Sequence, residues 1–221
     1  MNKILTDKWE DTNCHIFNIK FFNIFIMAKY TSILFFLITI SCGVKNLPIL
    51  DDKITVVPIN NKIFKNKNLF DKSLLKLIDT TAIYIEDYNY QSSAKDFKNV
   101  NNKVYHTRNY HNVCYKFYAN GCLNSISAYG ADYFNSVSTE DVNPMKTGNR
   151  GVFYKKNNQI QMDEFGVVGN NLFSKEYGIN TSVIEIKGDT LFKKSKFDMK
   201  TVTVYLKKKL PKEFLIYKPE W

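Results

Sequence analysis

Arginine is almost absent from this sequence, in which Arg108 and Arg150 are the only two. Proteins that read nucleic acids usually rely on arginine, because its guanidinium group makes paired hydrogen bonds to phosphates and base edges. The formal net charge of +10 comes almost entirely from lysine, which is typical of a solvated surface. We therefore expect no nucleic-acid partner.

Motifs that carry catalysis or hold cofactors are also missing. The chain has no glycine-rich phosphate loop, no nucleophile elbow and no zinc-type spacing of cysteine and histidine. His15 lies near the N-terminus, whereas His106 and His111 are five residues apart and point to opposite faces of an extended chain. We therefore predict no metal site, no cofactor and no enzymatic activity. The acids instead form adjacent pairs, which do not by themselves place two carboxylates across a bond: Glu86-Asp87, Glu140-Asp141 and Asp163-Glu164.

A run long enough to span a membrane is missing near the N-terminus. The apolar stretch from Ile33 to Ile40 is much shorter than the roughly 20 residues that a spanning helix needs. It follows Lys29 and ends just before Cys42, which is the order of an export signal: a basic start, an apolar middle and a cleavage site. The segment therefore predicts export.

The end of this signal resembles the lipobox of bacterial lipoproteins, in which a small residue precedes a cysteine that receives a diacylglyceryl group. Ser41 and Cys42 fit that pattern, whereas Thr39 stands where leucine is usual. The resemblance implies that Cys42 is lipidated and that its fatty-acid chains hold the protein at a membrane of the cell envelope. Because residues 43–46 carry no acid, we expect the periplasmic face of the outer membrane.

These features divide the chain into four parts. Residues 1–26 carry acids where a signal should be basic, so we interpret them as an upstream extension and expect translation to begin at Met27. Residues 27–41 are the predicted lipoprotein signal peptide, and residues 42–66 a polar tether in which 54–57 could form a short strand. Residues 67–221 form the predicted β-rich domain.

The domain begins with a short predicted helix, from Asp71 to Asp79. Its leucines and isoleucine lie on one side, Lys72 and Lys76 lie on the other, and Asp71 is placed as the N-cap. A helix of this length is marginal alone, so its apolar stripe should cover the open end of a barrel or one face of a sheet.

Turn dipeptides then recur at strand-length intervals. Asn120-Gly121, Asn157-Asn158 and Gly188-Asp189 each tolerate the positive φ of tight hairpin turns, and each separates two strand-like runs. A later run, from Thr201 to Leu206, alternates like a half-buried strand, and 214–217 could form a final one. Two-residue turns predict these facing pairs: Phe117/Asn124, Tyr115/Ile126, Val113/Ala128, Phe153/Met162 and Ile186/Leu191.

The fold class that follows is mainly β: an antiparallel meander forming a small barrel or half-barrel, with one short N-terminal helix. The stretches Phe-Tyr-Ala-Asn-Gly, Gly-Val-Phe-Tyr-Lys-Lys-Asn-Asn-Gln-Ile and Ile-Lys-Gly-Asp-Thr-Leu resemble hairpins of small Bacteroidota lipoproteins. That resemblance implies a lipocalin-like domain, and it implies no catalytic residues.

Cys114 and Cys122 are the two cysteines of the predicted domain. With a two-residue turn at Asn120-Gly121 they point to opposite faces of the hairpin, about 16 Å apart along the strands. A disulfide needs Cα atoms within about 7 Å, so we expect two buried, reduced thiols.

A cluster of tyrosines is the one candidate ligand site. Tyr84, Tyr88 and Tyr90 fall on one face of a regular strand, where they could stack on a sugar or line a pocket. The leading hypothesis is a membrane-anchored, non-enzymatic binding or interaction module whose partner is a small apolar ligand, a glycan or an envelope protein. The alternative is a carbohydrate-binding protein or hydrolase of the envelope, which requires two carboxylates that converge in a groove.

Overall fold

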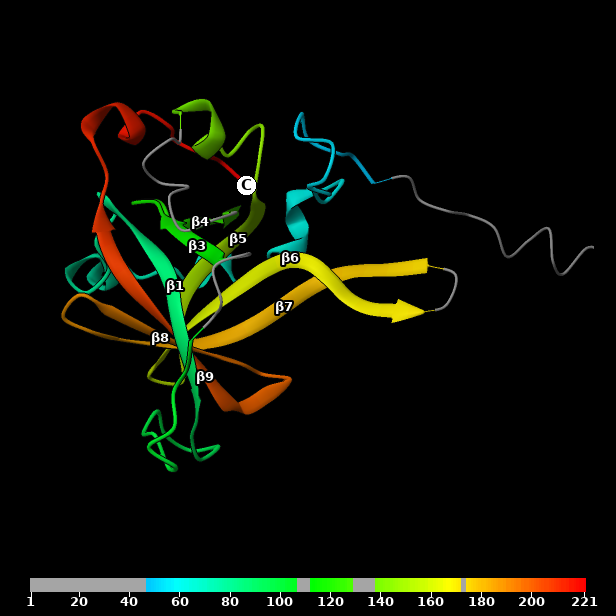
Figure 1. Cartoon of the computed structure of the whole chain (residues 1–221). Helices are drawn as coiled ribbons and strands as arrows, with labels where there is room; N and C mark the ends of the chain where they lie inside the picture. Colours follow the sequence, from blue (N-terminus) through cyan, green and yellow to red (C-terminus); the bar gives the residue numbers. More distant parts are fainter. Residues whose placement is uncertain (1–46, 107–111, 129–137, 172–173) are drawn as a thin grey trace, which may run out of the picture. The chain divides into compact units, whose positions relative to one another are not determined.

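Eight antiparallel strands close into a barrel in the computed structural model, which describes residues 47–106, 112–128, 138–171 and 174–221 (Figure 1). The predicted leader and Cys42 lie outside the described residues. The barrel strands are β1 (Ala82–Gln91), β3 (Asn112–Phe117), β4 (Cys122–Ala128), β5 (Asn149–Lys156), β6 (Gln159–Asn171), β7 (Ser174–Lys187), β8 (Thr190–Ser195) and β9 (Asp198–Lys209).

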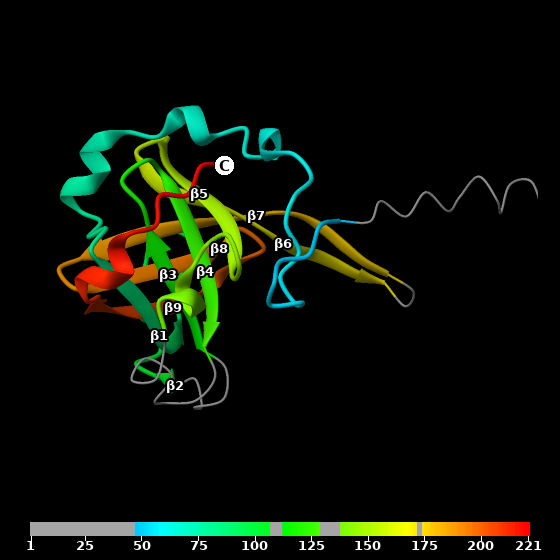
Figure 2. The same ribbon diagram turned by 90° about the horizontal axis from the view of Figure 1, so that it is seen from above.

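The ring closes because β1 pairs with β9 as well as with β3. The β1–β9 ladder runs from Ala82 opposite Lys209 to Gln91 opposite Thr201, and every other barrel strand pairs with its neighbour in sequence. The short strand β2 (Tyr105–His106) adds to β1 outside the ring. The prediction of a mainly β, antiparallel meander that forms a small barrel is confirmed, and both views show the strands wrapped around one interior (Figure 2).

Two of the three predicted hairpins have the expected register. Asn157 and Asn158 both adopt positive φ, of 52° and 60°, and Phe153 faces Met162 across β5 and β6. Positive φ at both central residues is the type I′ geometry, whose twist matches that of paired strands. Gly188 has φ of 60°, and Ile186 faces Leu191 across β7 and β8.

The third hairpin has a different register from the one predicted. Its loop has three residues, ending at Gly121 with φ of 84°, and Phe117 therefore faces Leu123 instead of Asn124. The shift of one residue places Cys114 and Cys122 on the same face, which corrects the prediction of opposite faces. Cys114 pairs with Ile126, four residues or about 13 Å along β4 from Cys122. Both thiols are free and buried, so the predicted absence of a disulfide is confirmed.

No α-helix is present in the described residues, and the predicted helix from Asp71 to Asp79 is instead the 3-10 helix η3 (Lys72–Lys76). Asp71 is the N-cap as predicted, and its carboxylate accepts a hydrogen bond of 2.8 Å from the Ser73 N–H. A run this short forms few α-helical hydrogen bonds, so its conformation follows the packing of its leucines. Leu74 and Ile78 are buried in the barrel core and close one end of the barrel.

The described part of the expected tether, residues 47–66, packs on the barrel. Val57 and Phe64 are each 4% exposed, and within the 54–57 segment the only pairing is an isolated bridge from Val56 to Ile49. The predicted strand at 214–217 is also wrong: it lies at the 3-10 helix η5 (Lys212–Leu215) and the loop that follows. Three further 3-10 turns are η1 (Asn61–Ile63), η2 (Lys67–Leu69) and η4 (Glu140–Val142).

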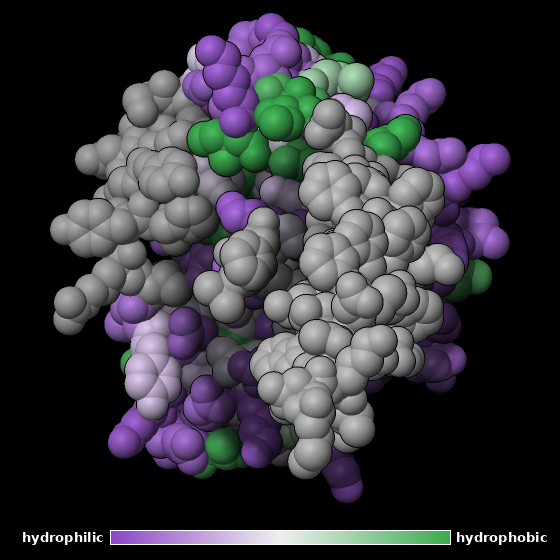
Figure 3. All heavy atoms as spheres, turned by 90° about the vertical axis from the view of Figure 1, so that its right-hand side faces the viewer, coloured by the Kyte–Doolittle hydropathy of each residue, from purple (hydrophilic) through white to green (hydrophobic). Residues whose placement is uncertain are grey.

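Figure 3 shows one face of the domain coloured by hydropathy. On the face turned to the viewer in Figure 3, hydrophilic side chains dominate what is coloured, and hydrophobic ones gather near the upper edge. Within the described residues, no helix has the length and apolar character to cross a membrane.

Substitutions at two turn glycines, Gly121 and Gly188, test how closely the turns pack against their neighbours. A Cβ at Gly121 would lie 2.6 Å from Phe70 Cγ in addition to the strain of positive φ, whereas a Cβ at Gly188 would meet nothing within 4 Å. We expect Gly121→Ala to lower the free energy of unfolding by about 2 kcal/mol or more, and Gly188→Ala by only about 1 kcal/mol. Urea denaturation compares them, and equal costs would show that Phe70 does not pack on this turn.

Candidate functional site

One half of the barrel interior is filled by its own apolar side chains. Residues from all eight barrel strands meet the plug formed by Leu74 and Ile78, and all of them are at most 3% exposed. Aromatic edge-to-face contacts join Phe117 to Phe153 and to Tyr84, with ring centroids 5.2 and 5.5 Å apart. This half is a packed core, as small eight-stranded barrels allow.

The other half of the interior is more polar, and on four strands the change occurs within one inward step. Side chains on the same face of a strand are two residues apart, so the inward position after an apolar residue is two positions on. The inward chain continues from Tyr84 to Glu86 on β1, from Leu123 to Ser125 on β4, from Met162 to Glu164 on β6, and from Leu191 to Lys193 on β8. Tyr115 and Tyr205, both buried, separate the two halves.

A hydrogen-bonded network connects these polar side chains across the barrel. The Tyr115 hydroxyl donates to Glu164 Oε2 over 3.0 Å, and the Ser125 hydroxyl donates to Glu164 Oε1. Lys193 Nζ donates to the Tyr115 hydroxyl over 2.5 Å and lies 4.9 Å from the centre of its ring. A lysine, a phenol and a carboxylate therefore form a continuous chain.

Glu86 brings a second carboxylate to the same interior from the opposite wall. Strands β1 and β6 are four positions apart in the ring of eight, so Glu86 and Glu164 start from opposite sides. Glu86 is the cross-strand partner of Tyr205, and its Oε2 accepts a hydrogen bond of 3.2 Å from the Val113 N–H. Glu86 and Glu164 are both partly exposed, so solvent reaches them.

The two tyrosines of this site stay protonated at neutral pH. Burial raises the pKa of Tyr115 well above its usual value, and the neighbouring charge of Glu164 raises it further. Burial also raises the pKa of Tyr205, with a further contribution from the charges of Glu86 and Glu164. Both phenols therefore remain hydrogen-bond donors next to the carboxylates.

The predicted tyrosine row is divided by a bulge in β1. The register against β9 shifts between Glu86 and Tyr88, so Tyr84 points into the barrel core while Tyr88 and Tyr90 lie in an outer cluster. Phe97 packs on that cluster and accepts a hydrogen bond from the Tyr90 hydroxyl at its backbone carbonyl. The prediction that all three share one face is wrong, because a regular period of two does not continue through a bulge.

The other residues considered from the sequence are separated in space. Asp163 points to the outer face, where its carboxylate accepts hydrogen bonds from Asn66, Tyr154 and Thr181. His106 is exposed on β2, and His15, His111 and the proposed lipid site Cys42 lie outside the described residues. Among the described residues, no three histidine, cysteine or acidic side chains are grouped to hold a metal ion.

Sequence reasoning missed Glu86, Glu164 and Lys193 as members of one site. A signal for Glu164 was present, because the correctly predicted pair Phe153/Met162 places position 164 on the inward face. The opposition of Glu86 to Glu164 depends on ring closure between β1 and β9, which pairs the first and last barrel strands.

Comparison with other proteins adds no functional assignment. No protein-family model, no curated protein and no solved structure matches this chain.

The interior network predicts energetic coupling between Tyr115 and Glu164. We expect Tyr115→Phe to lower the free energy of unfolding by about 1–2 kcal/mol, because the carboxylate loses a donor and Lys193 loses an acceptor. In a Glu164→Gln background the same change should cost less. Chemical denaturation of the four proteins measures the coupling. Tyr177→Phe, at a ring that stacks on Phe165 in the outer cluster, is a control expected within about 0.5 kcal/mol of the parent.

Proposed function

We propose that this protein is a membrane-anchored lipoprotein of the cell envelope whose lipocalin-like barrel is a non-enzymatic binding module. Its ligand is a small hydroxylated molecule, of which a sugar is the simplest example, and it binds in the polar half of the barrel. The observation that carries the proposal is the convergence of Glu86, Glu164 and Lys193 on the Tyr115–Tyr205 pair inside a closed barrel.

The interior favours a polar ligand over an apolar one. Its apolar half is occupied by side chains such as Phe117, Phe153 and Met162, which are fully buried. In the polar half, Glu164 accepts two hydrogen bonds from described partners, and a carboxylate has about four acceptor positions. Lys193 has three N–H donors and uses one on Tyr115. This remaining capacity suits the hydroxyl groups of a small polyol.

The aromatic pair supports the same class of ligand. The rings of Tyr115 and Tyr205 lie edge to face with centroids 5.1 Å apart, and their phenols remain protonated. A ligand bound to Glu164 and Lys193 would lie beside these aromatic side chains, and apolar rings next to charged hydrogen-bonding groups suit the mixed surface of a sugar.

The proposed location at a membrane of the cell envelope depends on lipidation of Cys42. Acylation there places the barrel at a membrane, where the periplasmic face of the outer membrane is the expected site, and a ligand-binding barrel suits an envelope that exchanges small solutes. The 47–66 segment packs along the barrel, so in this proposal the anchor joins the domain through a short connection.

Lipid attachment is tested by metabolic labelling. When the full chain is expressed in a bacterium supplied with radiolabelled palmitate, we expect label in the wild-type protein and none in Cys42→Ala. Cys114→Ala and Cys122→Ala should keep the label, because those thiols are buried in the folded domain. Unlabelled wild-type protein with its leader still attached would rule out the proposed anchor.

Ligand binding is tested with a panel of monosaccharides and amino sugars by ligand-observed NMR on the purified domain. For any sugar that binds, Glu164→Gln and Lys193→Met should each weaken binding about tenfold, since each removes hydrogen bonds to a charged group. Lys156→Met, at an exposed hairpin position, is the matched control and should bind as the parent does. Binding that survives both interior changes would place the ligand outside the barrel interior.

A glycan hydrolase is the second candidate, favoured by one observation: two carboxylates, Glu86 and Glu164, enter the same interior from opposite walls. A glycosidase uses such a pair as acid and as base or nucleophile. Release of nitrophenol from nitrophenyl glycosides separates the two functions. Under the binding proposal no glycoside is cleaved, whereas turnover that disappears in Glu86→Gln and in Glu164→Gln would establish the hydrolase.

A further inference from the structure

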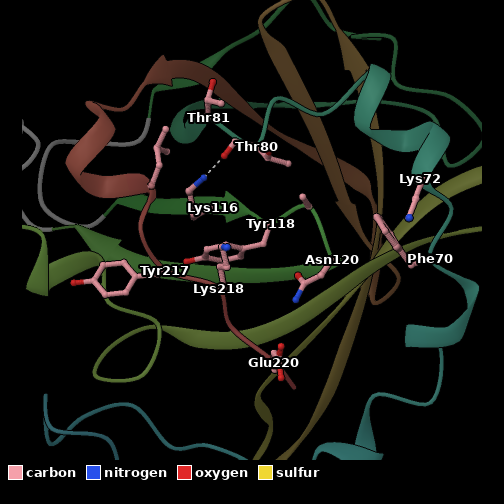
Figure 4. A pocket seen from close by; sticks show the side chains of 12 residues that line it. Phe70, Lys72, Thr80, Thr81, Lys116, Tyr118, Asn120, Tyr217, Lys218 and Glu220 are labelled. Atoms are coloured by element: carbon pink, nitrogen blue, oxygen red, sulfur yellow. Dashed lines mark hydrogen bonds between the residues drawn. The ribbon is translucent and has the colours of Figure 1, made fainter.

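A cavity lies outside the barrel interior, on the outer face of the β3–β4 hairpin. It has a volume of about 730 Å³ and is bounded by the hairpin, by the segment that carries η3, and by the C-terminal segment after η5 (Figure 4). This volume lies within the range of small-molecule binding sites. The proposed function makes no use of it.

The walls of this cavity are mainly apolar. Phe70 stands on one side, Leu215 belongs to the C-terminal segment, and the ring of Tyr118 forms part of the floor (Figure 4). The cavity opens at the exposed Lys72 and Lys218, so its rim is positively charged, with Glu220 as the one acid among its lining residues.

Lys116 places a buried cation in this apolar setting. It is 4% exposed, and its ammonium group donates to the backbone carbonyls of Thr80 and Phe117. The ammonium also lies 5.2 Å from the centre of the Tyr118 ring. Among the described residues, Lys116 forms no ion pair with a carboxylate. Burial of a charge without a counter-ion is costly, and an anion in the cavity would offset that cost.

We propose that this cavity binds a small amphipathic carboxylate, with its carboxylate on the Lys116 ammonium and its apolar chain against Phe70, Tyr118 and Leu215. An ammonium has three N–H donors, and Lys116 uses two on backbone carbonyls, so one is left for the ligand. A single donor suits a carboxylate with one negative charge. Lys72 and Lys218 at the rim attract such an anion.

The charge of Lys116 changes in a pH range in which ligand binding can be measured. Burial lowers its pKa to about 8, and the charge of Asp79 raises it by a smaller amount. The other charged groups around the cavity are Lys72, Lys218 and Glu220. The ammonium form binds the anion, so affinity should be nearly constant from about pH 6 to about pH 8 and should fall up to tenfold per unit as pH rises further.

Calorimetric titration of the purified protein with octanoate and with octanol tests the proposal. We expect octanoate to bind the parent at least tenfold more tightly than octanol, because only the anion pairs with Lys116. Lys116→Met should remove this preference and its pH dependence while octanol still binds. Lys218→Glu, at an exposed rim position, should weaken octanoate several-fold with the fold intact, and Lys156→Met should change nothing.

Three results would overturn this assignment: no octanoate binding, equal affinity for octanoate and octanol, or undiminished octanoate binding in both Lys116→Met and Lys218→Glu. Octyl phosphate binding more tightly than octanoate would also contradict a site built for one negative charge. If Lys116→Met does not fold, Lys218→Glu and the pH profile of the parent still decide. Because no sugar takes part, this test can fail or succeed independently of the interior site.

Discussion

Ring closure between β1 and β9 is the constraint on which the rest of the domain depends. The two strands pair over almost the whole length of β1, which joins the first and last strands of the barrel and leaves neither as an open edge. An interior exists only because this ladder forms. The same ladder contains the bulge between Glu86 and Tyr88, which keeps Glu86 inside and turns Tyr88 outward. One irregularity therefore decides which side chains of β1 belong to the polar site.

Inside the ring, the period of two along each strand explains why apolar and polar halves meet so sharply. Successive inward residues are Leu123 then Ser125 on β4, and Leu191 then Lys193 on β8, so the same change from apolar to polar occurs on opposite sides of the ring. Tyr115 and Tyr205 suit that boundary, since each has an apolar ring and a polar hydroxyl. The packed half keeps the phenols buried, and their burial keeps them protonated beside Glu164.

Much of the barrel follows from local sequence, whereas the site does not. Asn157-Asn158 and Gly188-Asp189 determine their turns, and these turns determine the register that pairs Phe153 with Met162 and Ile186 with Leu191. The position of Glu86 opposite Glu164 depends on strands that are far apart in the chain, and no single turn determines how these strands are placed. The plug at Lys72–Lys76 was located from its leucines, but its 3-10 form depends on the barrel end that it covers.

The predicted register of the β3–β4 hairpin is wrong because β3 is buried on both faces. Tyr115 and Phe117 point into the barrel, while Cys114 and Lys116 are covered from outside, and all four are at most 4% exposed. A strand buried on both faces loses the alternation that would reveal its register, and the choice between a two-residue and a three-residue turn at Asn120-Gly121 is then not fixed by the pattern.

The outer layer that hides this pattern is built from segments without strands. The 47–66 segment and the C-terminal residues pack on the barrel from outside, and Trp221 donates from Nε1 to the Gly151 carbonyl over 2.7 Å. Elsewhere, Lys194 is 1% exposed and donates to the Ser93 and Asp96 carbonyls. The wrapping segments thus bury polar groups of the barrel wall and satisfy them with backbone carbonyls. Lys116 differs from Lys194 in one respect: its covering segments leave a cavity beside it, and that space is what makes its charge available to a ligand.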